Sequence, residues 1–254
     1  MARATAELKF RSHLQGNYKR QMNPNFTSNT EWSNPRFGGT QAEAERGSYL
    51  LSLEFLRTTR AYTLEIAQTL SQRQMDYQAE AGKWSVGEVL DHLILGQRLN
   101  LCYITEVIGM KKAGHRPVLR LGFEDVDVSL AHVPKNILPA LEVPFTVLNI
   151  FLPSKVRDLI TRYRLVPAQN PRLTSPRRFR PADELRNELI ASFRETEALL
   201  ESNVDLDFSE MLIQHPLLGN NDVSGLLRFL ALHEQRHQSQ IESVLRSPGF
   251  PASA

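Results

Sequence analysis

The sequence contains very little cysteine, and its apolar residues are not gathered into long runs. Cys102 is the only cysteine in 254 residues, which excludes an internal disulfide and suits a reducing, cytoplasmic location. No apolar run approaches the ~20 residues that a membrane-spanning helix needs. The richest stretch, 137–152, is interrupted by Pro139, Glu142 and Pro144. The N-terminal sequence lacks the apolar segment of a signal peptide. We therefore expect a cytoplasmic protein without a membrane span.

A strong charge of either sign is also missing. Lys and Arg number 30 and Asp and Glu number 28, so the formal net charge is only +2. This balance gives no reason to expect nucleic acid or an anionic membrane as a partner. Apolar residues make up 41% of the chain and charged residues 23%, which is typical of a globular protein. We expect a small molecule as the substrate.

Four segments repeat apolar residues at the spacing of an amphipathic helix. They cover approximately residues 43–73, 85–111, 182–202 and 222–245. In the first segment, the expected buried face comprises Leu51, Phe55, Thr58, Tyr62, Ile66 and Leu70. In the third it comprises Leu185, Leu189, Phe193, Thr196 and Leu200. The hydroxyl of Thr196 can bond to a carbonyl of the preceding turn, which makes a threonine tolerable on this face.

Local signals mark the starts of two of these helices. Ser85 and Glu88 have the spacing of a capping box, and Trp84 is placed to pack onto Val89. Asp222 is the expected N-cap of the last helix. These signals predict sharp helix starts at both positions.

The pattern as a whole predicts an all-α protein, a single four-helix bundle over residues 43–248. Residues 1–42 are polar and lack a sustained period, which predicts a flexible N-terminal arm. Residues 115–180 predict an irregular insertion between the second and third helices, with a short strand near 126–133. This insertion has two open roles, a lid over a site and a contact in a homodimer. We expect a loop at 203–221.

Histidines occupy positions on two helices where the pattern calls for apolar residues. His233 and His237 are four residues apart and therefore lie one turn apart on one face of the last helix. His92 lies on the apolar face of the second helix, together with Val89. Gly96 follows His92 by one turn, and it indicates either close helix packing or space beside the imidazole.

A metal ion explains the three histidines together. An imidazole buried without a partner costs roughly 2–7 kcal/mol on apolar transfer scales. A divalent ion bound by His92, His233 and His237 removes this cost for all three. Three neutral ligands leave at least one coordination position open, as in catalytic sites. Zn, Ni, Co and Fe(II) all suit this ligand set, and the sequence does not choose among them.

The segment His233–His237, HEQRH, also matches the H-E-x-x-H motif of zinc metalloproteases, in which the glutamate is the general base. Those enzymes take a third ligand further along the chain. No histidine follows His237, and Glu242 lies about 140° around the helix from it. The third ligand must therefore come from an earlier helix, which makes a protease an unsuitable interpretation.

Other polar candidates have weaker claims. Glu234 is a candidate general base, but it lies about 100° around the helix from His233 and has a surface or supporting role as its alternative. Glu88 is explained by the capping box. Cys102 lies about 280° around from His92, so we expect a small buried residue and not a nucleophile. Three further histidines are expected on the surface or in loops: His13, His132 and His215. For His215, a position at the mouth of the site is the alternative.

Lys83-Trp84-Ser85, Glu88 and His92-Leu93, followed by His233 to His237 and Gln240-Ile241, resemble the DinB-like superfamily. The resemblance covers approximately residues 47–245. It implies an up-up-down-down bundle that binds a metal through one histidine of the second helix and two of the fourth. His92, His233 and His237 match these positions. The arm and the long insertion depart from the compact family pattern.

The resemblance also suggests an activity, because the superfamily includes metal-dependent S-transferases that use bacillithiol or mycothiol and a thiol-dependent isomerase. A low-molecular-weight thiol bound as thiolate would attack an electrophilic small molecule. One alternative is a hydrolase that uses metal-bound hydroxide. The other is a metal-binding stress or interaction protein without turnover.

Overall fold

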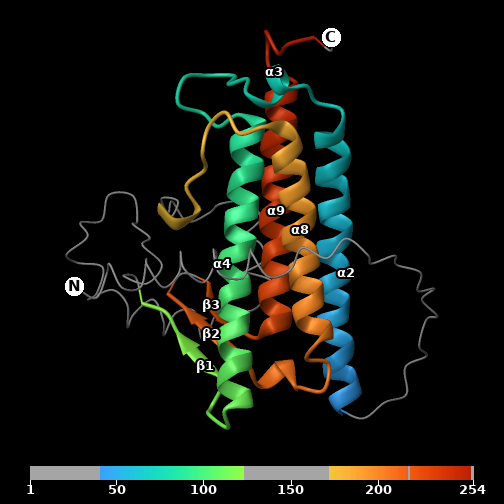
Figure 1. Ribbon diagram of the computed structural model, residues 1–254, viewed down its shortest axis with the longest axis vertical. Coiled ribbons are helices and arrows are strands. Elements are labelled where there is room, and N and C mark those ends of the chain that lie inside the picture. The colour runs from blue at the N-terminus through green and yellow to red at the C-terminus, as the bar shows by residue number, and fades with distance from the viewer. Residues whose placement is uncertain (1–40, 123–171, 217, 253–254) are drawn as a thin grey trace. The chain divides into compact units, whose positions relative to one another are not determined.

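Four long helices dominate the computed structural model, which describes residues 41–122, 172–216 and 218–252, with side chains from residue 48 onward. The helices are α2 (Gln41–Gln68), α4 (Val86–Lys112), α8 (Ala182–Glu201) and α9 (Val223–Leu245), and a short helix, α3 (Gln72–Met75), follows α2 (Figure 1). The chain divides into two units, 1–38 and 39–254, and all described residues belong to the second. Most of the predicted arm, the predicted strand near 126–133 and most of the insertion lie outside the described residues.

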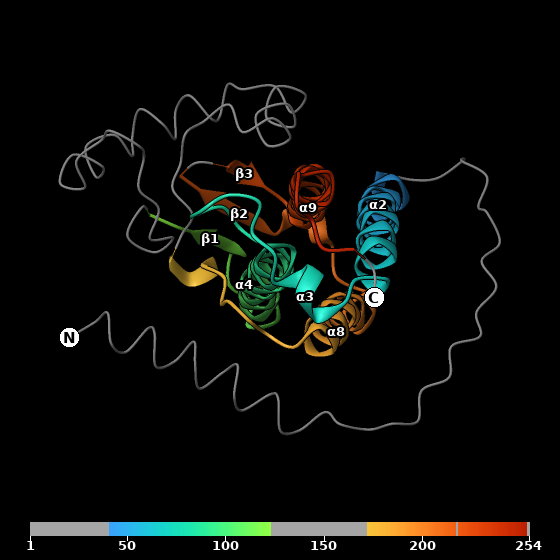
Figure 2. The same cartoon turned by 90° about the horizontal axis from the view of Figure 1, so that it is seen from above.

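The four long helices form a bundle, in which α2 packs against α9 and α8, and α4 packs against the same two helices (Figure 2). Two apolar clusters show the helix directions. The first cluster joins the start of α2 and α9 to the end of α4 and α8, through Tyr49, Leu226, Ile104 and Leu200. The second cluster joins the opposite ends, through Ala67, Ile241, Val89 and Leu185. Hence α2 and α9 are parallel, and α4 and α8 are antiparallel to both.

These directions determine the topology. Along the chain the helices run up, down, down and up. Around the bundle, in the order α2, α9, α4 and α8, they run up, up, down and down. The order along the chain differs from the up-up-down-down order that the resemblance implied, and that order is found only around the bundle.

The predicted helix caps are present. The Glu88 backbone amide donates to Ser85 Oγ at 3.2 Å, and the Ser85 amide donates to Glu88 Oε2 at 2.9 Å, which completes the capping box of α4. The Asp222 side chain accepts from the Gly225 amide at 2.6 Å and caps α9. In α8, Thr196 Oγ1 donates to the Ser192 carbonyl at 3.0 Å. The polar side chains at these positions therefore bond to backbone groups that helix ends and turns leave available.

The first helix differs from its prediction in two ways. It ends at Gln68 instead of continuing to residue 73, because Ser71 and Gln74 form a second capping box that starts α3. The predicted buried face is also wrong in part: Leu51, Thr58 and Tyr62 are exposed, Phe55 and Ile66 are partly buried, and Leu70 is buried. The side chains of α2 that are buried in the bundle are Tyr49, Leu53, Leu56, Thr59, Arg60, Thr63 and Ala67. Arg60 and the two threonines are polar, so a search for apolar residues at helical spacing does not find this face.

The segment predicted as a loop at 203–221 has structure of its own. It contains a 3-10 turn (Phe208–Glu210) and the antiparallel strands β2 (Leu212–His215) and β3 (Gly219–Asn221). The strand β1 (Val118–Arg120), just after α4, pairs in parallel with β2. The fold is therefore mostly helical with a small three-stranded sheet, and "all-α" describes only the bundle. Strands this short do not produce a recognisable alternation in sequence.

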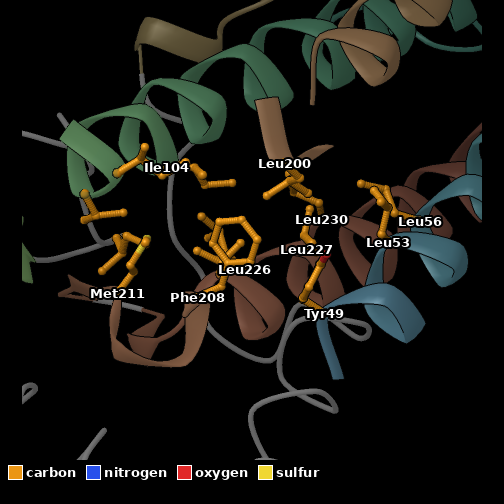
Figure 3. Packing of buried hydrophobic residues seen from close by; sticks show 14 of the residues in the cluster. Tyr49, Leu53, Leu56, Ile104, Leu200, Phe208, Met211, Leu226, Leu227 and Leu230 are labelled. Atoms are coloured by element: carbon orange, nitrogen blue, oxygen red, sulfur yellow. The ribbon is translucent and has the colours of Figure 1, made fainter. Parts of the chain in front are cut away.

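The first apolar cluster fills the end of the bundle next to this sheet (Figure 3). Leu226 and Leu227 of α9 pack with Phe208 and Met211 from the segment before it, and Leu56 of α2 is completely buried. The cluster thereby attaches the 208–221 segment to the helices. Within the described part of the chain, no helix combines the length and the apolar composition that would let it cross a membrane.

The corrected face of α2 yields a stability prediction from two leucines of one helix. Leu56→Ala should lower the free energy of unfolding by about 2–5 kcal/mol, because Leu56 is fully buried and its removal leaves a cavity. Leu51→Ala should change it by less than about 0.5 kcal/mol, because this side chain is 66% exposed. Urea denaturation followed by circular dichroism measures both. A larger loss of unfolding free energy in Leu51→Ala than in Leu56→Ala would instead support the buried face predicted from the sequence.

Candidate metal centre

The three predicted histidines come together between α4 and α9. His92 lies in the second turn of α4, while His233 and His237 lie one turn apart on α9. One nitrogen from each imidazole lies within 4.8 Å of those of the other two. His92 and His237 are buried, and His233 is partly buried. Because α4 and α9 are antiparallel neighbours, residues 141 positions apart can share one site.

Hydrogen bonds orient two of the imidazole rings. The Thr174 carbonyl lies 2.7 Å from His92 Nδ1. A carbonyl only accepts, so Nδ1 carries the proton and Nε2 keeps a free lone pair. His237 Nδ1 lies 2.9 Å from Gln240 Oε1, which has the same effect. Such partners on the distal nitrogen are a regular feature of histidines that bind metals.

Burial keeps the imidazoles of His92 and His233 neutral. Burial, with a smaller contribution from the positive charge of Arg236, lowers the pKa of His92 to about 4, although the hydrogen bond with the Thr174 carbonyl acts in the opposite direction. Burial is also the main reason why the pKa of His233 lies well below its ordinary value, and His237, Arg236 and His92 add to the effect. Neutral imidazoles offer lone pairs at neutral pH, so they are ready to act as ligands.

Aromatic rings border the three histidines. The Trp84 ring centroid lies 4.9 Å from that of His92. It lies 6.1 Å from that of His237, and the Trp84 and His237 rings are stacked. The Phe229 ring lies 5.6 Å from that of His233. Trp84 also packs against the apolar cluster that contains Val89, in agreement with its predicted position. Aromatic walls of this kind lower the local polarity and strengthen electrostatic interactions inside the site.

The Thr174 carbonyl reaches His92 because an ion-pair cluster fixes the segment 172–180 against α4. Asp91, fully buried, accepts from the Arg177 backbone amide at 2.7 Å and from the Arg177 and Arg180 guanidinium groups, both at 2.9 Å. Burial alone would raise the pKa of Asp91, but these hydrogen bonds outweigh it and lower the pKa. Asp91, which precedes His92 in the sequence, thus holds the segment 172–180, whose Thr174 carbonyl orients the His92 ring.

Glu234, the predicted general base, is buried on a different side of α9. Its Oε1 accepts from Arg60 Nε at 2.9 Å and from Thr63 Oγ1 at 2.6 Å, while its Oε2 accepts from Arg60 Nη2 at 2.9 Å. Arg60 and Glu234 are only 3% and 1% exposed. With both oxygens bonded to α2, the carboxylate is suited to holding α9, and these contacts favour a supporting role over the predicted role as a base.

This ion pair belongs to a buried polar layer between the two apolar clusters. The layer contains Arg60, Thr63, Gln97, Ser192, Thr196, Glu234 and Gln238. Arg60 also donates to the Leu189 carbonyl at 2.6 Å and to Gln97 Oε1 at 2.5 Å, and Gln97 donates to Thr196 at 3.0 Å. Each of the four long helices contributes, and every buried side-chain polar atom of the layer has a hydrogen-bond partner. A fully bonded layer avoids the large penalty of an unpaired buried polar group.

The layer fixes the rotation of α9 relative to α2. Glu234 follows His233 directly and bonds to Arg60, and Gln238 follows His237 directly and donates to the Thr59 carbonyl at 2.8 Å. Each candidate ligand is therefore followed by a residue tied to α2. A rotation of α9 that moved the imidazoles out of position would break these buried bonds.

The remaining candidates lie elsewhere. His215 ends β2, and its Nδ1 accepts from the Leu218 amide at 3.2 Å, as a turn residue would; burial lowers its pKa to about 4. Burial, assisted by Glu195, raises the pKa of Cys102, which disfavours a thiolate. A Cβ added to Gly96 would meet no described atom within 4 Å, so close packing against the described residues does not explain this glycine. His13 and His132 lie outside the described residues.

The residues present fit a divalent metal ion. The Nε2 atoms of His92 and His233 are 3.4 Å apart. Two imidazole nitrogens on one tetrahedral ion, each ~2.0–2.1 Å from it, would be separated by roughly 3.3 Å. One nitrogen from each of the three imidazoles faces this common position, and the three residues could hold zinc or a similar transition metal.

The structure is thus a helical bundle in which three convergent histidines on two antiparallel helices could hold a metal ion. Residues 56–241 match the family model described as the DinB superfamily, and the chain belongs to that superfamily. A search of curated proteins found no match. No solved structure matched either.

Three supporting features were not predicted from the sequence. Thr174 acts through its carbonyl, which every residue has, so no sequence signal identifies it. Asp91 and Arg60 are charged residues on helices and look like surface residues in a single sequence. Gln240 was noted as part of the family pattern, and the structure gives it a partner, His237.

The metal site predicts a measurable composition. Protein purified without chelator should contain about one divalent transition-metal ion per chain, and the His233→Ala/His237→Ala double variant should contain much less. At ~100-fold excess over Kd, metal bound only to the folded state adds about 2.7 kcal/mol to stability. EDTA should therefore lower the Tm of the wild type but hardly change that of His92→Ala. Equal metal contents by elemental analysis in wild type and double variant would contradict the site.

The polar layer predicts unequal effects of single and double substitutions. Glu234→Leu should reduce the free energy of unfolding by roughly 3–5 kcal/mol, because the buried Arg60 loses its carboxylate. The double variant Arg60→Met/Glu234→Leu should be more stable than Glu234→Leu, because no unpaired charge remains. Denaturation curves give both values, and metal titration should show affinity falling by about 10–100-fold in Glu234→Leu. Unchanged stability and affinity in Glu234→Leu would show that the carboxylate does not hold α9.

Proposed function

We propose that this DinB superfamily protein is a metal-dependent enzyme that transfers a low-molecular-weight thiol to a small electrophile. The observation that carries the proposal is the candidate ligand set, three imidazoles without a carboxylate. Such a set leaves the positive charge of a divalent ion uncompensated and leaves room for a ligand from solution. An anionic sulfur ligand suits both features, and the superfamily includes enzymes that use bacillithiol or mycothiol.

The chemistry needs a thiolate at neutral pH. A bound divalent ion would lower the pKa of a thiol, as it does that of water. The thiolate sulfur then forms a bond to the electrophilic carbon of the second substrate, and the leaving group departs with the bonding electrons. A cosubstrate supplies the thiol in this proposal, because burial raises the pKa of Cys102, the single cysteine, and disfavours its thiolate.

The protein's own residues hold and shield this site. Thr174 and Gln240 keep the Nδ1 atoms of two histidines engaged, so that the Nε2 atoms face the ligand. Trp84 and Phe229 border the imidazoles with apolar rings and limit access of water. Glu234 supports the site through Arg60 and need not exchange protons with substrate.

Thiol transfer gives a direct activity prediction. Metal-loaded protein should accelerate conjugation of bacillithiol, mycothiol or a simpler thiol to monochlorobimane, measured by fluorescence. The rate should follow metal occupancy and fall by at least about 100-fold in His92→Ala, His233→Ala and His237→Ala, because each variant loses a ligand. Cys102→Ser should keep nearly the full rate and serves as the matched control.

Other outcomes would select the alternatives. Turnover of esters or amides that needs metal but no thiol would identify a hydrolase that uses metal-bound hydroxide. Stoichiometric metal without turnover of any thiol, ester or amide would identify a metal-binding protein without catalysis. Loss of activity in Cys102→Ser, with no effect of chelation, would show a cysteine mechanism.

A further inference from the structure

Residues 172–180, here called the strap, lie along α4 and lead into α8 (Figure 1). The strap begins with a 3-10 turn that packs against α4. Its Thr174 carbonyl lies 2.7 Å from His92 Nδ1. His233 and His237 are positioned differently, because the residues that follow them bond to α2. The orientation of the α4 ligand therefore depends on the strap.

One carboxylate fixes the strap at two points. Asp91 is fully buried, and its Oδ2 accepts from the Arg177 backbone amide at 2.7 Å. Its Oδ1 accepts from the guanidinium groups of Arg177 and Arg180, both at 2.9 Å. Hydrogen bonds between a guanidinium and a carboxylate are charge-assisted and stronger than neutral ones. The two arginines enclose residues 178 and 179, so Asp91 closes a short loop of the chain.

Phe179, inside this loop, has an unfavourable backbone conformation. Its φ is 58°, and it is the only non-glycine residue with a positive φ in the described part of the chain. In this left-handed region, the Cβ of an L-residue lies too close to the following carbonyl. Phe179 is 68% exposed, so burial of its ring does not offset the strain. A strained residue persists only where its surroundings hold it, and the bonds of Asp91 hold both sides of this one.

The closed strap thus combines strong anchors with a strained residue between them. Opening would relieve the strain at Phe179 but would break the bonds to Asp91. It would also withdraw the Thr174 carbonyl and leave the His92 ring free to turn. An ion in the centre would then keep only His233 and His237 as oriented ligands. Partners on the distal nitrogen of a histidine contribute substantially to metal affinity.

We propose that the strap sets how long the metal centre retains its ion, and that the ion leaves when the strap opens. Asp91 is a positioning residue in this scheme, because it acts on His92 through the strap. The inference requires the metal site but not thiol transfer. It adds a control of metal exchange to the proposed function.

The test measures the release of cobalt from cobalt-loaded protein at saturating EDTA, followed by the loss of the visible cobalt absorption. Arg177→Gln should release cobalt roughly tenfold faster than wild type, because the strap loses a charge-assisted bond to Asp91. Arg57→Gln is the matched control, since it removes another partly exposed arginine that pairs with carboxylates, Glu54 and Glu197. It should release cobalt at the wild-type rate. Equal rates in wild type and Arg177→Gln would overturn the proposal.

Phe179 provides a pair of variants that isolates the backbone strain. Phe179→Ala and Phe179→Gly both remove the ring, but only glycine adopts a positive φ without strain. Phe179→Gly should therefore release cobalt roughly threefold or more slowly than Phe179→Ala, because its closed strap is less strained. General destabilisation would only accelerate release, so a slower rate identifies the strap. Identical rates in the two variants would contradict the role of the strained residue.

A measurement on metal-free protein separates the strap from the metal. The Nδ1 proton of His92, which is donated to the Thr174 carbonyl, exchanges with water when the strap opens. NMR should show faster exchange of this proton in Arg177→Gln than in wild type or Arg57→Gln. Unchanged exchange would show that the strap does not hold His92, whether or not cobalt binds. Cobalt release that follows the variants, in a protein that transfers no thiol, would support the strap and refute the proposed function.

Discussion

The buried ion pair between Arg60 and Glu234 is the interaction on which the rest of the structure depends. A guanidinium and a carboxylate removed from water are costly unless hydrogen bonds satisfy both groups. Here Glu234 bonds to Arg60 and Thr63, and Arg60 also reaches Gln97 of α4 and the Leu189 carbonyl of α8. The pair therefore needs all four long helices in register at once. Apolar packing alone would allow several rotations of a helix, whereas this set of bonds allows one.

The positions of the three candidate metal ligands depend on this register. Along α9, the residues that bond to α2 alternate with the histidines that face α4, so one helix connects the polar layer to the candidate ligands. A second constraint comes from the other side, where Asp91 and two arginines hold Thr174 against His92. Hydrogen bonds outside the site thus orient the rings of His92 and His237, as expected of a preorganised centre.

Much of this could be predicted from the sequence, and the misses have physical reasons. The histidines were recognisable because they interrupt an apolar face at helical spacing, and the capping box at Ser85 and Glu88 marked the start of α4. The buried face of α2 was not recognisable. Arg60 and its threonine neighbours look like surface residues, and their burial depends on Glu234, which lies 174 residues away in the sequence. A partner at that distance leaves no trace in a local pattern.

The wide separation of the paired residues has a consequence for the order of folding. Arg60 is made long before Glu234, and His92 long before His233 and His237, so neither the ion pair nor the complete centre can form until α9 is available. Closing loops of this length makes assembly slow relative to the formation of single helices. Before α9 docks, Arg60 lacks its carboxylate and favours hydrated, open arrangements of the first three helices. A metal ion bound by all three imidazoles would therefore report that the last helix is in place, and it would stabilise only chains that have completed the bundle.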